Sequence, residues 1–322
     1  MSSYLAEARY GKDKVRVFRT VREGKIYHVV EYNVEVLLEG DLETRRATYT
    51  QADNSVVVAT DSMKNITYYL AKISPHVLSA ERFGLHLATH LVSKYAHIHK
   101  AFVTIEQLRW ARITVDGKPH NHSFLRDGDE RRIVKVQVDG SQGKDKLVGN
   151  VSAGISDLLV LKSTGSAFEN FIRDEYTTLV EVDDRIFSTS VDLLYTFAPF
   201  EITAPKDEKK LDFGKEQIKG EGGLAAWEGI KVGESAREIT LSVFATDESA
   251  SVQATLYKMG QRLIKENTAV DRATYTLPNK HYIPVDMKYI GIDNTSPSLA
   301  EVFVPVSAPS GLISATVARV GA

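Results

Sequence analysis

The order of the secondary-structure signals is the feature that most constrains the fold of this chain. Strands are predicted at Val15 and Val17 and from 30 to 36, where apolar and polar residues alternate as on a half-buried strand. Two helices with apolar stripes follow, and two more strands come after them. The stripes are Met63, Ile66, Leu70 and Ile73, then Phe83, Leu87, Leu91 and Tyr95, and the later strands are 101–113 and 133–138. The first half therefore predicts strand, strand, helix, helix, strand, strand.

The second half repeats this order without close sequence identity to the first. An apolar run at 158–161 and a strand at 185–197 precede one helix around Ile239 and Val243. A second helix carries the stripe Val252, Leu256, Met259 and Leu263, and strands follow at 273–277, 282–286 and 302–304. A polar insert at about 205–223, rich in Lys, Asp, Glu and Gly, is expected to be an exposed loop. We therefore expect an α+β chain with two units, 1–150 and 151–322.

Antiparallel sheets with helices inserted in the middle place those helices on one face. A single such layer leaves sheet edges unpaired, and unpaired edges attract partners unless the strands close into a barrel. The pattern therefore predicts an oligomer, although it does not set the number of subunits.

The composition excludes several classes of protein. The chain has 322 residues, 43% hydrophobic and 25% charged, which is typical of a soluble globular protein. Its net charge of -2 argues against nucleic-acid or membrane partners. It has no bilayer-length apolar run, no secretory signal and no Ser-Lys-Leu terminus, so a cytoplasmic location is expected. The lack of cysteine excludes disulfides, thiolate catalysis and cysteine-based metal sites.

The stretch Pro278-Asn279-Lys280-His281-Tyr282 carries the most informative chemistry. An imidazole can move a proton near neutral pH, and a neighbouring carboxamide can bind an oxygen atom or a small polar ligand. Because Pro-Asn is also turn chemistry, a plain turn between two strands is the alternative.

Other short segments give this stretch its context. They are Tyr10-Gly11-Lys12-Asp13, Val58-Ala59-Thr60-Asp61-Ser62, Asp116-Gly117-Lys118-Pro119-His120, Leu161-Lys162-Ser163-Thr164-Gly165-Ser166, Arg173-Asp174-Glu175-Tyr176-Thr177-Thr178-Leu179, Ser251-Val252-Gln253-Ala254-Thr255 and Pro309-Ser310-Gly311-Leu312-Ile313. Together they resemble the urate oxidase (uricase) family, over a span from Tyr10 to about Thr316. The resemblance implies two tandem tunnelling-fold domains with paired helices on one face. It also implies sheets that join into a barrel on oligomerisation, and a homotetramer with active sites at subunit interfaces.

The resemblance also implies the site residues. Lys12, Thr60 and His281 would form the catalytic group, with the lysine and threonine from one subunit and the histidine from its neighbour. Substrate binding would fall to Thr60, Asp61, Phe168, Arg185, Val252, Gln253 and Asn279, and Leu179 and Ile313 would line the pocket.

These residue types suit the chemistry of the implied substrate. Urate is a planar anion, so an arginine can grip its edge, a glutamine can both donate and accept, and an aromatic ring can stack on it. The electron-rich anion can itself reduce dioxygen, so we expect no cofactor and no metal. The protein then supplies a proton acceptor, a fixed geometry and a dry pocket for converting urate, O2 and water to 5-hydroxyisourate and hydrogen peroxide.

Each residue also has an ordinary structural interpretation. Lys12 could be a surface lysine, Thr60 a helix cap (with Asp61 or Ser62 better suited), Arg185 part of a surface ion pair, Gln253 a solvated side chain and Phe168 a core residue. The family pattern favours the functional interpretation because it selects all of these residues at once.

Three histidine pairs invite a metal interpretation. They are His86 and His90, His97 and His99, and His120 and His122. A zinc-protease helix needs Glu directly after its first histidine, whereas Leu87 stands there, and no cysteine or carboxylate cluster completes a set.

Two other functions stay open: a pterin-type enzyme of the same fold, and a non-catalytic purine-binding protein. Pterin-type enzymes typically anchor the base with glutamate, whereas the corresponding anchor here is Gln253. The chain also departs from the usual family pattern at Ser310, Ser314 and Ala315, which concerns the pocket wall.

Overall fold

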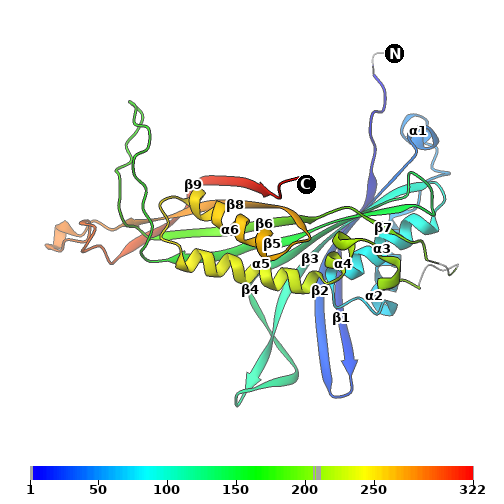
Figure 1. Cartoon of the computed structure of the whole chain (residues 1–322), viewed down its shortest axis with the longest axis horizontal. Coiled ribbons are helices and arrows are strands. Elements are labelled where there is room, and N and C mark those ends of the chain that lie inside the picture. Colours follow the sequence, from blue (N-terminus) through cyan, green and yellow to red (C-terminus); the bar gives the residue numbers. More distant parts are fainter. Residues whose placement is uncertain (1–2, 206, 208–211, 322) are drawn as a thin grey trace.

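The computed structural model describes residues 3–205, 207 and 212–321. Its strands form one antiparallel sheet with helices on one face (Figure 1). The strands are β1 Tyr10–Glu23, β2 Ile26–Gly40, β3 Ile98–Val115, β4 Lys118–Asp139, β5 Leu147–Lys162, β6 Phe187–Phe197, β7 Phe200–Ile202, β8 Val270–Pro284 and β9 Phe303–Ala318. The helices are α1 Leu42–Thr50, α2 Thr60–Ile73, α3 Ala80–Lys94, α4 Glu221–Trp227, α5 Gly229–Thr246 and α6 Val252–Glu266, with short 3-10 turns at Lys215–Gln217 and Lys288–Ile290.

The sheet runs β1-β2-β3-β4-β5-β6-β8-β9, with β7 paired to β5. The two expected four-stranded units meet at β4 and β5, which pair from Arg131↔Ser156 to Asp139↔Val148, so the units share one continuous sheet. Helices α2 and α3 pack on the first four strands, and α5 and α6 pack on the last four. This arrangement confirms the predicted α+β class with paired helices on one face.

Alternation along the strands places the core between the sheet and the helices. On β2, every second residue from Val30 to Gly40 is buried, while the residues between them stay partly exposed. Most residues of the predicted stripes of α2 and α3 are buried against this face, with Met63 and Phe83 fully enclosed. Ile66 and Tyr95 are only partly buried, and Ile73, at the end of α2, is 40% exposed. Each fully buried side chain of this size stabilises the fold by about 1.5–3 kcal/mol.

No helix in the described part of the chain has the length and apolar character needed to cross a membrane. The cytoplasmic location expected from the sequence stays a prediction.

A buried ion pair ties the helices to the middle of the sheet. Arg132 on β4 donates from Nε to Glu81 on α3 at 2.9 Å, and its Nη2 also donates to the Gly229 carbonyl at 2.8 Å and to the Tyr195 hydroxyl at 3.1 Å. The Glu81 side chain is completely buried. A Cβ at Gly233 would lie 1.7 Å from Nη1 of Arg132, so only glycine fits there. The two halves therefore share one polar network at their junction.

One expectation and one alternative interpretation of local structure are wrong. The polar insert is not an exposed loop throughout, because Phe213 and Ile218 are each only 4% exposed and α4 already begins at Glu221. Its residues 206 and 208–211 lie outside the described residues. The stretch 278–282 is not a turn, since it lies within β8 between β6 and β9.

The sequence also missed or shortened several elements. Helices α1 and α4 and strand β7 were not predicted, and β5 begins well before the apolar run at 158–161. The strands predicted at 273–277 and 282–286 are one strand, β8.

A long segment, 163–186, joins β5 to β6 and projects from one end of the sheet (Figure 1). Asp184 holds its base, because its carboxylate accepts from the Thr164 hydroxyl at 2.5 Å and from the Gly165 amide at 2.7 Å. The Ser166 amide donates to the same carboxylate at 3.3 Å. The Thr164 bond first, and then the two amides, lower the pKa of Asp184.

We predict that Glu81→Ala strongly destabilises the chain, because it leaves the Arg132 guanidinium buried without its anion. Breaking a buried pair in this way costs about 3–5 kcal/mol of unfolding free energy. Glu43→Ala is the control, since its pair with Arg46 spans 3.8 Å at the surface and is worth less than about 1 kcal/mol. Denaturant unfolding compares the variants, and equal stability of the two would contradict the prediction.

We also predict that the base of segment 163–186 loosens in acid. The folded chain lowers the pKa of Asp184, so its contribution is present above the ordinary pKa of about 4 and is lost as the pH falls through the lowered value. Exposure limits this contribution to about 1 kcal/mol. Hydrogen exchange should show protected Gly165 and Ser166 amides that lose protection in Asp184→Asn at neutral pH. Asp183→Asn, at the exposed neighbouring carboxylate, should leave that protection unchanged.

Candidate functional site

Most of the predicted site residues gather where β6 begins and α6 begins. The Arg185 amide donates to the Ser166 carbonyl at 2.8 Å, and the Ser249 amide donates to the Gly165 carbonyl at 3.0 Å. Phe168 pairs with Val182 through two backbone hydrogen bonds. These bonds bring the Phe168 ring, the Arg185 side chain and the first turn of α6 to the same corner.

Arg185 is the unpaired cation of this corner. Its guanidinium carbon lies 5.3 Å from the centre of the Phe168 ring. No carboxylate of the described residues pairs with it, and burial lowers its pKa. The group stays charged, because the ordinary pKa of arginine lies far above neutrality. A half-buried cation without an anion is unfavourable, so the corner is suited to an anionic ligand.

The N-terminus of α6 adds hydrogen-bond donors. Ser251 is the N-cap, and its hydroxyl accepts from the Ala254 amide at 3.1 Å. The amides of Val252 and Gln253, in the first turn, have no partner within the helix. The Val252 side chain is buried and that of Gln253 is exposed. Free amides at a helix N-terminus attract an anion, as Arg185 does.

Strand β8 supplies the polar pair Asn279 and His281. Alternation places Leu277, Asn279 and His281 on one face of the strand, and burial falls from complete at Leu277 to partial at the other two. The register against β9 shifts between Asn279 and His281. Such bulges redirect side chains and are common beside functional sites.

The neighbours of Asn279 form the floor of this corner. Gly311 lies opposite it on β9, and a Cβ there would be 3.9 Å from Asn279 Cβ and 3.8 Å from Ile313 Cδ1. Thr189 lies opposite it on β6, fully buried, and its hydroxyl makes no hydrogen bond within the described chain. Ile313 therefore lies beside Asn279, whereas Leu179 is 49% exposed on the projecting segment.

Lys12, Thr60 and Asp61 form a second group, near the start of β1. The Tyr10 hydroxyl accepts from the Val58 amide at 2.9 Å, which draws the start of α2 against β1. The bond from Lys64 lowers the pKa of Asp61, and the nearby charge of Lys12 lowers it further. The carboxylate of Asp61 is thus already engaged by its own helix.

Helix α2 begins without a side-chain cap. Its N-cap is Ala59, so the interpretation of Thr60, Asp61 or Ser62 as the cap is wrong. The amides of Thr60 and Asp61 are free of intrahelical partners, and Thr60 adds a hydroxyl. Lys12 lies at a bulge, since the β1–β2 register shifts between Lys12 and Val15. Lys12 and the N-terminus of α2 thus form the same combination of a cation and a helix N-terminus as Arg185 and α6.

The two groups lie far apart within one chain. The row of paired residues that starts at Lys12 runs through Val36, Val103, Val136 and Val151 and reaches β8 near Val270. Asn279 lies nine residues further along β8, or about 30 Å at 3.3 Å per residue. Strand β8 is also six positions from β1 in the sheet. The Lys12 group and the Arg185 group, each a proposed half-site, therefore do not meet within one chain.

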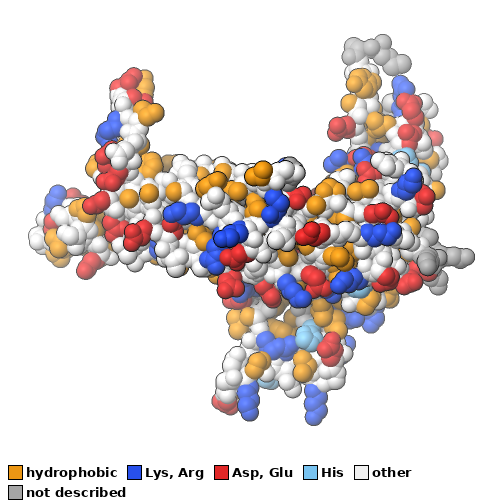
Figure 2. Space-filling model, viewed as in Figure 1, with side chains coloured by type: hydrophobic (Ala, Val, Ile, Leu, Met, Phe, Trp, Pro, Cys, Tyr) orange, Lys and Arg blue, Asp and Glu red, His pale blue; other side chains and the backbone are white. Residues whose placement is uncertain are grey.

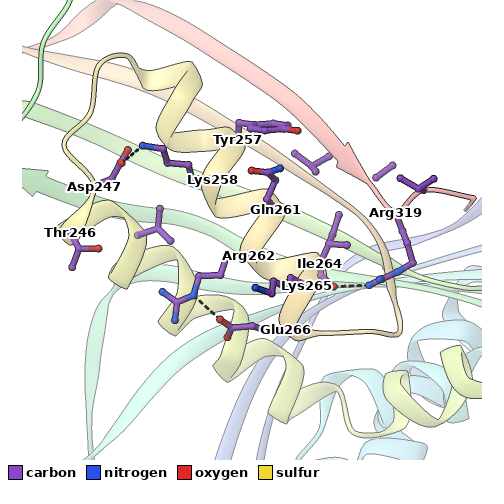
Figure 3. A pocket seen from close by; sticks show the side chains of 14 residues that line it. Thr246, Asp247, Tyr257, Lys258, Gln261, Arg262, Ile264, Lys265, Glu266 and Arg319 are labelled. Carbon is purple, nitrogen blue, oxygen red and sulfur yellow. Dashed lines mark hydrogen bonds and ion pairs between the residues drawn. The ribbon is translucent and has the colours of Figure 1, made fainter.

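A separate groove of about 1020 Å³ lies between α5, α6 and the end of β9 (Figure 3). It contains none of the predicted site residues, and most of its charged side chains are paired with one another. Lys258 pairs with Asp247, and Arg262 pairs with Glu266 at 2.7 Å. Arg319 donates to the Ile264 carbonyl at 2.6 Å. Apart from Lys265, the charged side chains that line the groove are therefore engaged by their neighbours.

Histidines from two of the three pairs make ordinary side-chain contacts within the fold. His86 bonds through Nδ1 to the Ser74 hydroxyl at 2.9 Å and stacks on Phe213 with ring centres 5.3 Å apart. The rings of His120 and His122 meet edge to face on a hairpin. Among the described residues, no three His, Cys, Asp or Glu side chains form a group that could hold a metal ion.

The structure adds residues to which the sequence assigned no role. Tyr10 positions the start of α2, Asp184 holds the segment that carries Phe168, and Thr189 lies under Asn279. Phe171 contacts the Phe168 ring, and Arg173 contacts the Phe171 ring. The spacing of Phe168 and Phe171, three residues apart, was the one sequence signal for any of these contacts.

Comparisons with known proteins identify the family of the chain. The sequence model of the family described as "Uricase" matches residues 8–137 and 151–314. The chain is 46% identical over 320 residues to a uricase of Emericella nidulans, covering 98% of each chain. It is 45% identical to a uricase of Aspergillus flavus, covering 98% of this chain and 97% of that one.

A solved structure gives the same result. The crystal structure of a uricase from Arthrobacter globiformis superimposes with a TM-score of 0.82 at 32% identity. The match covers 100% of this chain and 97% of the other. On sequence and on fold, the chain belongs to the uricase family.

Proposed function

We propose that this chain is a urate oxidase whose active site is completed by a second copy of the chain. The observation that carries the proposal is the unpaired Arg185 guanidinium beside the Phe168 ring and the free N-terminus of α6. That corner offers a cation, an aromatic face and amide donors, which together match a planar anionic purine.

Binding would use both sides of the purine. Arg185 can donate two parallel hydrogen bonds to an anionic edge, and Gln253 can donate to and accept from the opposite edge. The Val252 amide would add a donor, and Phe168 would stack on the ring plane. Leu179 and Ile313 would exclude water at the rim, which strengthens the electrostatic contacts.

Proton movement would need the other half-site. Lys12 of one copy would accept a proton from urate, Thr60 would relay it through a hydroxyl that both donates and accepts, and His281 of the neighbour would return it. The free Asp61 amide would hold the substrate, and Asn279 would hold dioxygen or water above the purine plane. Bulges at both Lys12 and Asn279 are typical of residues aimed at a site.

The reaction balances without a resident cofactor. Urate loses two electrons to dioxygen, and two protons convert the reduced oxygen to hydrogen peroxide. Water supplies the oxygen that becomes the hydroxyl of 5-hydroxyisourate. The protein's part is to hold the partners together and to move protons.

An oligomer would also cover the apolar surface of this end. Ile172, Tyr176 and Tyr289 are each more than four-fifths exposed, which is unusual for large apolar side chains. Orange side chains recur on the projecting arm and on the hairpins below the sheet (Figure 2). We propose that units 1–150 and 151–322 are two tunnelling-fold domains, that partner sheets close a barrel, and that two barrels form a homotetramer.

We predict that dialysed, chelator-treated protein oxidises urate in air. Ultraviolet absorbance of urate should fall while hydrogen peroxide forms, at the rate of untreated protein. Urate binding without oxidation would indicate a purine-binding protein, and no urate binding would favour a pterin-type enzyme. A metal or flavin that restores activity after removal would contradict the proposed mechanism.

We predict that two inactive variants restore activity when their chains are mixed. Lys12→Met should lower kcat far more than urate affinity, and Arg185→Ala should mainly lose affinity. In mixed oligomers, one site can pair an intact Lys12 from one chain with an intact Arg185 from the other, so random mixing should give about a quarter of wild-type activity. Lys25→Met, at an exposed hairpin tip, is the control and should stay active alone. Activity that never recovers would contradict the split site.

A further inference from the structure

The Phe171 ring stacks on the Phe168 ring, and a second arginine, Arg173, lies over Phe171. Phe171 stacks on Phe168 with ring centres 5.0 Å apart and planes 12° from parallel. The Arg173 guanidinium carbon lies 5.4 Å from the centre of the Phe171 ring. The same guanidinium donates through Nη1 to the Leu179 carbonyl at 2.7 Å. One side chain thus contacts the stack and also holds the backbone of a residue proposed to line the pocket.

This arrangement limits how a planar ligand can approach. Because Phe171 covers one face of Phe168, that face is closed to a stacking ligand. A guanidinium over an aromatic ring is attractive, and near-parallel rings at this distance add to it. The stack therefore fixes the plane of the Phe168 ring. The hydrogen bond from Arg173 to the Leu179 carbonyl holds these two parts of the segment together.

Few contacts outside the segment fix the plane of the Phe168 ring. Phe168 and Phe171 are partly exposed and do not belong to the buried core. Ile172, between Phe171 and Arg173, is 92% exposed. Asp174 folds the tip of the segment locally, accepting from the Tyr176 amide at 3.0 Å and from the Thr177 hydroxyl at 2.9 Å. The geometry of the stack is thus set within the segment, largely independent of the global fold.

We propose that Phe171 and Arg173 are positioning residues that preorganise Phe168 and Leu179 for stacking of the purine ring. The proposal rests on the proposed urate oxidase function. Neither side chain touches the substrate. Their effect is on affinity, because a ring that is already held flat loses less freedom when the ligand binds.

The test compares Phe171→Leu with Phe171→Tyr, and Arg173→Met with Arg173→Lys, in the full-length protein. Phe171→Leu and Arg173→Met should raise the Kd for urate, measured without oxygen, and the KM by about 2- to 10-fold. Phe171→Tyr keeps the stacked ring and should restore the affinity. Arg173→Lys keeps the charge without the planar fork and should restore it only in part. The unfolding midpoint and the oligomeric state should match wild type.

Combining the changes sharpens the test. Phe171→Leu with Arg173→Met should cost less than the product of the single effects, because both act through one stack. Arg22→Met removes a guanidinium that lies 5.5 Å from the Tyr27 ring on a distant hairpin, and should leave Kd and KM unchanged.

Three outcomes would overturn the proposal. Wild-type Kd and KM in Phe171→Leu would show that the stack does not position Phe168. A dissociated oligomer with unchanged affinity would assign the segment to subunit contact instead. If the wild-type protein neither binds nor oxidises urate, the proposed function fails and the inference fails with it, whereas the first two outcomes leave the function intact.

Discussion

Pairing between β4 and β5 is the constraint on which the rest of the structure depends. It joins the two halves into one sheet, and the Glu81–Arg132 pair fastens helices to that junction. A continuous, well-packed sheet has little freedom to bend its ends together. The group at Lys12 and the group at Arg185 are consequently held apart within one chain, so the proposed site needs a second copy to complete it.

The Lys12 group and the Arg185 group share three chemical features. Each has a cationic side chain, a helix N-terminus with free amides and a nearby strand bulge. Both attract negative charge, so an anion placed between two copies would be bound from both sides. If two copies bring these groups together, a substrate bound between them would also stabilise the assembly by mass action.

Segment 163–186 carries several of the proposed binding residues and connects them to the sheet. Asp184 anchors its base, Phe168 and Arg185 stand where it meets β6, and Phe171 and Arg173 brace it from within. Because its contacts are local, it can be tuned by substitution without disturbing the core. This separation of roles, with a rigid scaffold and an adjustable binding segment, is common among proteins that bind small molecules.

The sequence by itself determined the α+β class, the helix stripes, the alternation of β2 and the short segments that carry the site, because these signals are local and periodic. It predicted the insert at about 205–223 as an exposed loop, since the buried apolar residues Phe213 and Ile218 are isolated among polar ones. It interpreted 278–282 as a site, with a turn as the alternative, without placing it inside β8. Only the tertiary structure decided that Lys12 and Asn279 lie at opposite ends of one sheet. That separation is the sum of strand registers across the whole sheet, a non-local quantity that no single stretch of sequence encodes.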